Sequence, residues 1–130
     1  LILEDEAMIR RLIHTTLSRA GYAVDETEEG HQTINVYQQA LDNGHAYDVV
    51  IMDLTIENGM GGVETMSRIR ELDPEVTAVV SSGYSDAPAM ADPKSFGFSS
   101  VLPKPYLPQQ LIDMVARLMA ERQGNTESQP

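Results

Sequence analysis

The chain has 130 residues, of which 42% are hydrophobic, so it can bury the core of one small domain but not of two. Acidic residues outnumber basic ones by 20 to 9, which gives a formal net charge of -11 at pH 7 and a pI near 4.5. This charge opposes binding to the phosphate backbone of nucleic acid. We therefore expect a single globular domain that makes no direct contact with nucleic acid.

Cysteine is absent, and no apolar segment reaches the length of a membrane span. The lack of cysteine excludes disulfides, thiol chemistry and cysteine metal ligands. The short apolar segments, and the lack of a signal-peptide pattern, argue against membrane contact by this domain. Because Leu1 opens the chain only three residues before an acidic cluster, we expect a piece of a longer polypeptide. The expected location is the cytoplasm, which is compatible with a longer parent protein anchored in a membrane.

The first half of the chain alternates between strand and helix patterns, starting with a strand at Leu1 to Leu3. Gly21, a typical helix C-cap residue, follows six residues at helical spacing: Ile9, Leu12, Ile13, Thr16, Leu17 and Ala20. The pattern next predicts a short strand at residues 22–25, a helix at residues 31–41 and a strand at residues 49–53.

The second half continues this alternation. It predicts a helix at residues 62–72, a strand at 76–82, a fourth helix within 87–96 that Pro88 and Pro93 interrupt, and a strand at 100–102. A final amphipathic helix carries Leu111, Met114, Val115 and Leu118. Residues 123–130 are polar, and we expect a tail or linker there, after a domain of residues 1–122.

Strands that alternate with helices predict parallel βαβ units with helices on both faces of the sheet. Five strands make a small doubly wound α/β fold. In the strand order 2-1-3-4-5, ligands bind in the crevice outside the carboxyl ends of strands 1 and 3. The residues at these two ends are Glu4, Asp5 and Glu6 after the first strand, and Asp53 at the end of the third.

These acids predict a cation site. Unpaired carboxylates on neighbouring strands repel one another and raise each other's pKa, and a hard cation such as Mg²⁺ relieves that repulsion by taking oxygen ligands. Lys104 follows the fifth strand, so it can reach the same edge of the sheet. Acids, a central Asp53 and a lysine at three strand ends suggest a site for a divalent metal and a phosphoryl group.

Residues 1–122 resemble the receiver domain of two-component response regulators. The motifs that carry the resemblance are the acidic pair Glu4 and Asp5, the strand-end Asp53, the Ser82-Gly83 pair and the Lys104-Pro105 pair. The resemblance implies a flavodoxin-like fold with five helices and a signalling role in a phosphorelay. It identifies Asp53 as the phosphoacceptor and a histidine kinase or histidine phosphotransfer domain as the phosphodonor. The resemblance does not decide whether the domain forms a weak dimer.

The resemblance also implies a role for each residue of the site. Mg²⁺, or Mn²⁺ in its place, is held by Asp5, Asp53 and the carbonyl oxygen of Thr55, with Glu4 acting through water. Lys104 and Ser82 bind phosphoryl oxygens, and Gly83 leaves room for them. The Lys104-Pro105 peptide bond is expected to be cis. Ser81 is the alternative hydroxyl, since Ser81 and Ser82 point to opposite faces of their strand.

Three departures from the family pattern are visible. Glu4 stands where Asp is more usual, which lengthens the arm and keeps the charge. The loop after Asp53 has Glu57 in place of the usual Pro, and Met60 and Gly62 lie one residue late. Val101 occupies the position of the switching Tyr or Phe and has no ring for the aromatic route of output coupling, so Tyr84 is a candidate substitute.

Two other classes of protein share parts of this pattern. A haloacid-dehalogenase-type phosphatase also uses a strand-end Asp with Mg²⁺, but it needs a second Asp where this chain has Thr55. A flavodoxin-like electron carrier shares the fold, but Glu4, Asp5 and Glu6 would repel a flavin phosphate. We therefore expect a signalling receiver rather than an enzyme. The Lys-Pro-Tyr sequence at residues 104–106 favours the C-terminal receiver of a hybrid sensor histidine kinase.

Overall fold

The computed structural model describes residues 1–54, 60–83 and 87–127. Their strands are β1 (Ile2–Leu3), β2 (Glu26–Thr27), β3 (Val50–Asp53), β4 (Ala78–Ser82) and β5 (Ser100–Pro103). Their helices are α1 (Ala7–Arg19), α2 (Gly30–Asp42), α3 (Gly62–Leu72), α4 (Pro88–Ala91), the 3-10 helix η1 (Pro93–Phe96) and α5 (Pro108–Glu127). All strands are parallel, in the order β2-β1-β3-β4-β5, so the predicted fold class and strand order are confirmed.

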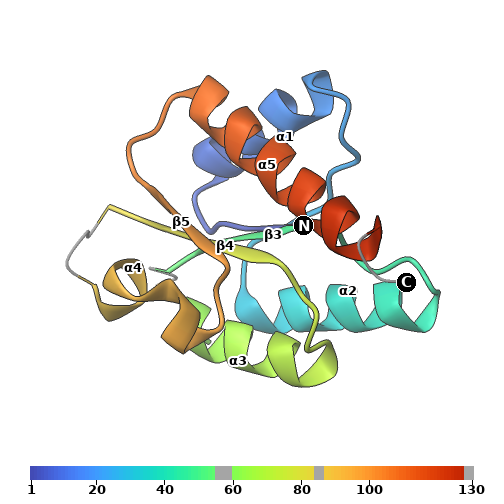
Figure 1. The fold of residues 1–130 in the computed structure, drawn as a ribbon. Coiled ribbons are helices and arrows are strands. Elements are labelled where there is room, and N and C mark those ends of the chain that lie inside the picture. The colour runs from blue at the N-terminus through green and yellow to red at the C-terminus, as the bar shows by residue number, and fades with distance from the viewer. Residues whose placement is uncertain (55–59, 84–86, 128–130) are drawn as a thin grey trace.

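Two layers of helices enclose the sheet, with α1 and α5 on one face and α2, α3 and α4 on the other (Figure 1). Side chains alternate between the two faces along each strand, as a pleated backbone requires. The α1–α5 core consists of Ile2, Ile13, Leu17, Ile51, Val79, Leu102, Leu111, Val115 and Leu118. The α2–α4 core consists of Leu1, Leu3, Tyr37, Val50, Met52, Met66, Ile69, Val76, Ala78, Val80, Ala89, Met90 and Phe98. Both faces of the central strands are therefore apolar, and polar residues collect at the strand ends.

The end of α1 agrees with the prediction from Gly21. This glycine has a φ of 99°, in the left-handed region that favours glycine. Its N–H donates to the carbonyl of Ser18, and the N–H of Tyr22 donates to that of Leu17. These bonds end the helix and turn the chain toward β2.

The strand predicted at residues 22–25 is wrong by a shift toward the C-terminus, because β2 occupies Glu26–Thr27. Pairing decides its position: Glu26 lies beside Ile2 and Thr27 beside Leu3, and β1 is only these two residues long. Tyr22 and Val24 instead pack as partly buried side chains against the α1–α5 core. Their apolar character, which suggested a strand, serves packing against this core.

The observed bounds of α4 and α5 also differ from the ranges predicted from the sequence. Within the predicted range 87–96, α4 is one turn long and η1 follows it, since Pro93 has no N–H to continue the α-helical bonding. Helix α5 continues to Glu127, so five of the residues expected in the polar tail are helical. Just before these residues, the guanidinium of Arg122 donates to the Glu75 carbonyl and the Thr77 hydroxyl. No helix among the described residues is long and apolar enough to cross a membrane.

Candidate functional site

Three carboxylates from two neighbouring strands meet at the carboxyl edge of the sheet. Leu3 is paired with Met52, so the next residues, Glu4 and Asp53, emerge side by side. One carboxylate oxygen from each of Glu4, Asp5 and Asp53 lies within 4.8 Å of the others. Glu4 is only 2% exposed and Asp53 4%, whereas Asp5 is partly exposed. The crevice therefore has two buried acids behind one that borders the solvent.

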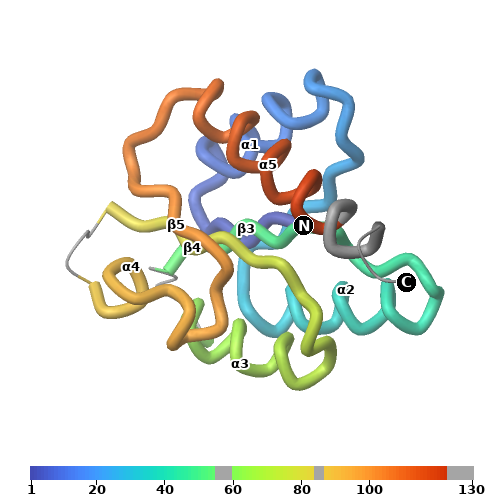
Figure 2. The backbone as a smooth tube through the Cα atoms, viewed as in Figure 1, coloured from blue at the N-terminus to red at the C-terminus, as the bar shows by residue number. Residues whose placement is uncertain are grey.

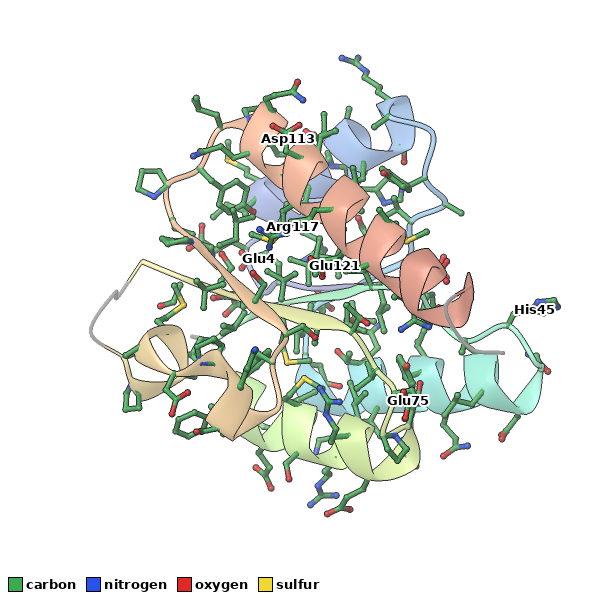
Figure 3. The ribbon with its side chains drawn as sticks, viewed as in Figure 1. Glu4, His45, Glu75, Asp113, Arg117 and Glu121 are labelled. Atoms are coloured by element: carbon green, nitrogen blue, oxygen red, sulfur yellow. The ribbon has the colours of Figure 1, made fainter. Side chains whose placement is uncertain are left out.

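Glu4 is held from three sides, between the strands and α5 (Figure 3). Its Oε1 lies 2.7 Å from the ammonium nitrogen of Lys104, and its Oε2 accepts from the backbone N–H of Glu6 at 3.2 Å. Its backbone carbonyl accepts from the guanidinium of Arg10 at 2.9 Å. Both carboxylate oxygens are thus engaged by donors.

Lys104 reaches the acids from β5, two strands away from Asp53 in the sheet. Its ammonium nitrogen is 3.6 Å from Asp53 Oδ2, compared with 2.7 Å from Glu4 Oε1. The N–H of Lys104 donates to the carbonyl of Ser82, which fixes the start of this segment on β4. The peptide bond between Lys104 and Pro105 is cis, as the resemblance predicts.

Burial and charge act in opposite directions on this group of side chains. Burial raises the pKa of Glu4 to about 7; the hydrogen bond from Lys104 lowers it, and the neighbouring Asp53 raises it. Burial alone would lower the pKa of Lys104, but the hydrogen bond to Glu4 and the charges of Asp53, Glu4 and Glu6 together raise it. Lys104 stays cationic, and Glu4 holds its negative charge only weakly near neutral pH.

The end of β4 carries the two candidate hydroxyl groups. Ser81 is buried and its hydroxyl donates to the carbonyl of Leu102 at 2.8 Å, which ties β4 to β5. Ser82 is the last residue of β4, and Gly83 follows it. A Cβ atom at Gly83 would meet no described atom within 4 Å, so the space beside this residue is open.

Gly62 fixes the position of Asp53 from the other side. A Cβ at Gly62, the first residue of α3, would lie 2.7 Å from the Asp53 carbonyl oxygen, which is closer than real Cβ contacts allow. Only glycine lets the helix start approach the backbone of the central acid so closely. Met60, two residues earlier, is buried.

Three sequence-based expectations fall on residues outside the described ranges: the metal-binding carbonyl of Thr55, the loop residue Glu57 and the candidate switch Tyr84. Val101 is described, and it packs as a partly buried side chain against the α2–α4 core. The prediction did not include Tyr106, whose ring packs against the α1–α5 core near the acids. Its position two residues after Lys104 was the feature of the sequence that could have predicted its place near the site.

Comparison with known proteins agrees with this geometry. A sequence model of the response regulator receiver domain family matches residues 1–116. The chain therefore belongs to the response regulator receiver domain family, and not to the phosphatases or electron carriers weighed above.

The similar proteins include stand-alone receivers and longer regulators. The chain is 24% identical over 119 residues to the chemotaxis protein CheY of Thermotoga maritima, and the match covers 91% of this chain and 94% of CheY. It is 29% identical over 119 residues to the transcriptional regulatory protein ResD of Bacillus subtilis, where the match covers 92% of this chain but only 47% of ResD. A crystal structure of a response regulator receiver protein from Sinorhizobium medicae superposes with a TM-score of 0.76 at 29% identity, covering 93% of each chain.

Proposed function

We propose that Asp53 accepts the phosphoryl group in this receiver, and that the donor is the phosphohistidine of a histidine kinase or histidine phosphotransfer domain. An Asp53 carboxylate oxygen attacks phosphorus, the bond from phosphorus to the imidazole nitrogen breaks, and the imidazole leaves. The observation that carries the proposal is the convergence of Glu4, Asp5 and Asp53 within 4.8 Å beside the Lys104 ammonium. This arrangement offers one nucleophile, further acids and one cation at a single edge of the sheet.

The donor set suits a hard divalent cation such as Mg²⁺ or Mn²⁺. Three carboxylates share one nearby ammonium, so the cluster carries excess negative charge, and oxygen ligands are those that Mg²⁺ prefers. Asp5 and Asp53 would hold the ion directly, Glu4 would act through water, and the Thr55 carbonyl would complete the set. When bound, the ion neutralises charge between the anionic phosphoryl group and the anionic nucleophile.

Lys104 and Ser82 bind the transferred phosphoryl group in this proposal. Lys104 carries a compact charge on a flexible stem, and its nitrogen already lies 3.6 Å from Asp53 Oδ2. To reach a phosphoryl oxygen it must exchange its bond with Glu4 for one with the new anion. The open space beside Gly83 gives room for the group at the end of β4.

Exposed apolar side chains on α1 and in the segment before α5 support docking of the phosphodonor near the site. Met8 and Leu12 lie one turn apart on α1, close after Asp5, and both are mostly exposed. Leu107 is also mostly exposed, in the segment that joins Lys104 to α5 (Figure 2, orange). A phosphohistidine must come within bonding distance of Asp53, so a protein that delivers it contacts the residues around the crevice. Exposed apolar side chains at that rim fit a protein partner.

The same proposal includes the wider setting: a cytoplasmic receiver of residues 1–122, carried by a hybrid sensor histidine kinase. Relatives such as ResD, of which this chain spans about half, carry the matching region within a longer chain, and this supports only a longer parent protein. The sequence of residues 104–106 favours the hybrid kinase over a DNA-binding regulator.

The test is phosphorylation by acetyl phosphate, followed by intact-mass measurement. The wild type should gain one phosphoryl group with Mg²⁺ present and none in excess chelator, and Asp53→Asn should gain none. Asp48→Asn is the matched control, because Asp48 is exposed near the opposite end of the same strand and should leave labelling unchanged. An unchanged adduct in Asp53→Asn, or full labelling in chelator, would overturn the proposal.

A further inference from the structure

The hydroxyl group of Tyr106 is buried close enough to Glu4 and Asp53 for their charges to act on it. Its ring packs against the α1–α5 core, two residues after Lys104, and its oxygen has no partner among the described residues. A buried hydroxyl left unpaired destabilises the folded state, so such a group calls for an explanation. Phenylalanine would fill the same space without this cost.

The charges that act on this hydroxyl are those of the candidate site. Burial raises the pKa of Tyr106 to about 12, and the carboxylates of Glu4 and then Asp53 add to the rise. The hydroxyl therefore keeps its proton at neutral pH and can donate one hydrogen bond. Glu4 is the stronger of the two charged influences on it, and it is an acceptor.

In the present state Glu4 needs no further donor. Lys104 occupies Oε1 and the Glu6 N–H occupies Oε2. Once Lys104 binds a phosphoryl oxygen, Oε1 loses its charged donor while Glu4 remains 2% exposed. A buried carboxylate that loses a donor is disfavoured unless others replace it. Each carboxylate oxygen has two acceptor sites, so Oε1 can take a further donor beside the water through which Glu4 would contact the metal ion.

We propose that Tyr106 is a positioning residue whose hydroxyl donates to Glu4 when Lys104 moves to the phosphoryl group. Tyr106 and Lys104 then alternate as the donor to one carboxylate oxygen. This inference rests on the proposed function, because the exchange starts only when a phosphoryl group is present. Tyr106 acts through Glu4 and does not touch the reacting atoms.

The test compares wild type and Tyr106→Phe with beryllofluoride, a stable mimic of the phosphoryl group, in the presence of Mg²⁺. We expect Tyr106→Phe to bind beryllofluoride about tenfold more weakly, equivalent to roughly 1.4 kcal/mol. Without Mg²⁺ and beryllofluoride the same variant should be at least as stable to urea as the wild type, because the unpaired hydroxyl is gone. A residue that only packs would change both measurements in the same direction. Tyr22→Phe, against the same core but at the far end of the sheet, should change neither.

A double-mutant cycle with Glu4→Ala identifies the acceptor. In the Glu4→Ala background, Tyr106→Phe should have no further effect on beryllofluoride affinity, since the acceptor is missing. Equal affinities for wild type and Tyr106→Phe, or an undiminished effect in the Glu4→Ala background, would overturn the inference. Either result leaves the proposed function intact as long as Asp53→Asn still blocks labelling, so the two failures are distinguishable.

Discussion

The Lys104 ammonium nitrogen lies 2.7 Å from Glu4 Oε1, although 100 residues separate the two in the chain. It is 0.9 Å farther from Asp53, at 3.6 Å compared with 2.7 Å. The site cation is therefore held mainly by the first acid rather than by the proposed phosphoacceptor. The longer arm of glutamate, where aspartate is more usual, brings its carboxylate to the lysine, and the predictions below follow from this pair.

The first prediction concerns the pH dependence of stability in metal-free protein. The pKa of Glu4 rises from its ordinary value of 4.5 to about 7 in the folded state, so folding favours the protonated form. This contribution is fully present below about pH 4.5 and is lost as pH rises through about 7. Relative to Glu4→Gln, the wild type should lose on the order of 2 kcal/mol of unfolding free energy between about pH 5 and about pH 8.

Urea unfolding in chelator measures this difference at each pH. Burial lowers the pKa of the terminal amino group to about 6, inside this window, but the group is common to both proteins and cancels when the difference is taken. A difference that stays constant across the window would show that Glu4 has the same pKa in the folded and unfolded chains.

The second prediction compares the two acids that follow β1. Asp5 is partly exposed, whereas both carboxylate oxygens of Glu4 are already engaged by Lys104 and the Glu6 N–H. Asp5→Ala should therefore weaken Mg²⁺ binding more than Glu4→Ala, by roughly tenfold or more. Calorimetric titration measures both affinities, and Glu6→Ala, which removes an exposed neighbouring acid, is the control. If Asp5→Ala binds Mg²⁺ as tightly as the wild type, Asp5 is not a ligand.

The third prediction is that Lys104→Met changes two affinities in opposite directions. Removal of its positive charge should strengthen Mg²⁺ binding by roughly tenfold, because the ammonium repels the cation. The same change should weaken beryllofluoride binding, since the anion loses its cationic partner. In metal-free protein near pH 8 it should also lower the unfolding free energy by about 1–2 kcal/mol, as Glu4 is left without its cation.

Lys94→Met is the matched control for this variant. Lys94 is the other lysine of the chain and is exposed on η1, so its removal should leave both affinities close to those of the wild type. Parallel changes of the two affinities in Lys104→Met would indicate a general distortion of the site instead of a charge effect.

The fourth prediction concerns the output of phosphorylation. Val101 is β-branched, partly buried against the α2–α4 core and too small to swing as an aromatic ring does. Amide chemical shifts with and without beryllofluoride should therefore change mainly at residues 82–90 and in the loop after Asp53. Large changes centred on Val101 and α5, with the Ser82 region unmoved, would show that the signal leaves by another route.

Local patterns predicted most of the helices and central strands correctly. The helix at residues 62–72 has the predicted bounds, because its apolar spacing, its glycine start and Asp73-Pro74 all act within a few residues. The strand predicted at residues 22–25 was displaced, because its place depends on pairing with Ile2 and Leu3. Helix α5 continues to Glu127, and near its end Arg122 contacts Glu75 and Thr77, more than 40 residues away in the chain, which a local pattern does not reveal.

The sequence by itself determined the α/β class, the order of the elements and the grouping of Glu4, Asp5 and Asp53 at one sheet edge. Periodicity and the topology of parallel sheets are enough for this, because the carboxyl ends of neighbouring parallel strands lie at the same edge of the sheet. Only the tertiary structure decided that Lys104 binds Glu4 more closely than Asp53 and that the Tyr106 hydroxyl is buried. These features depend on the directions and lengths of side chains packed across several strands, which a linear pattern does not contain.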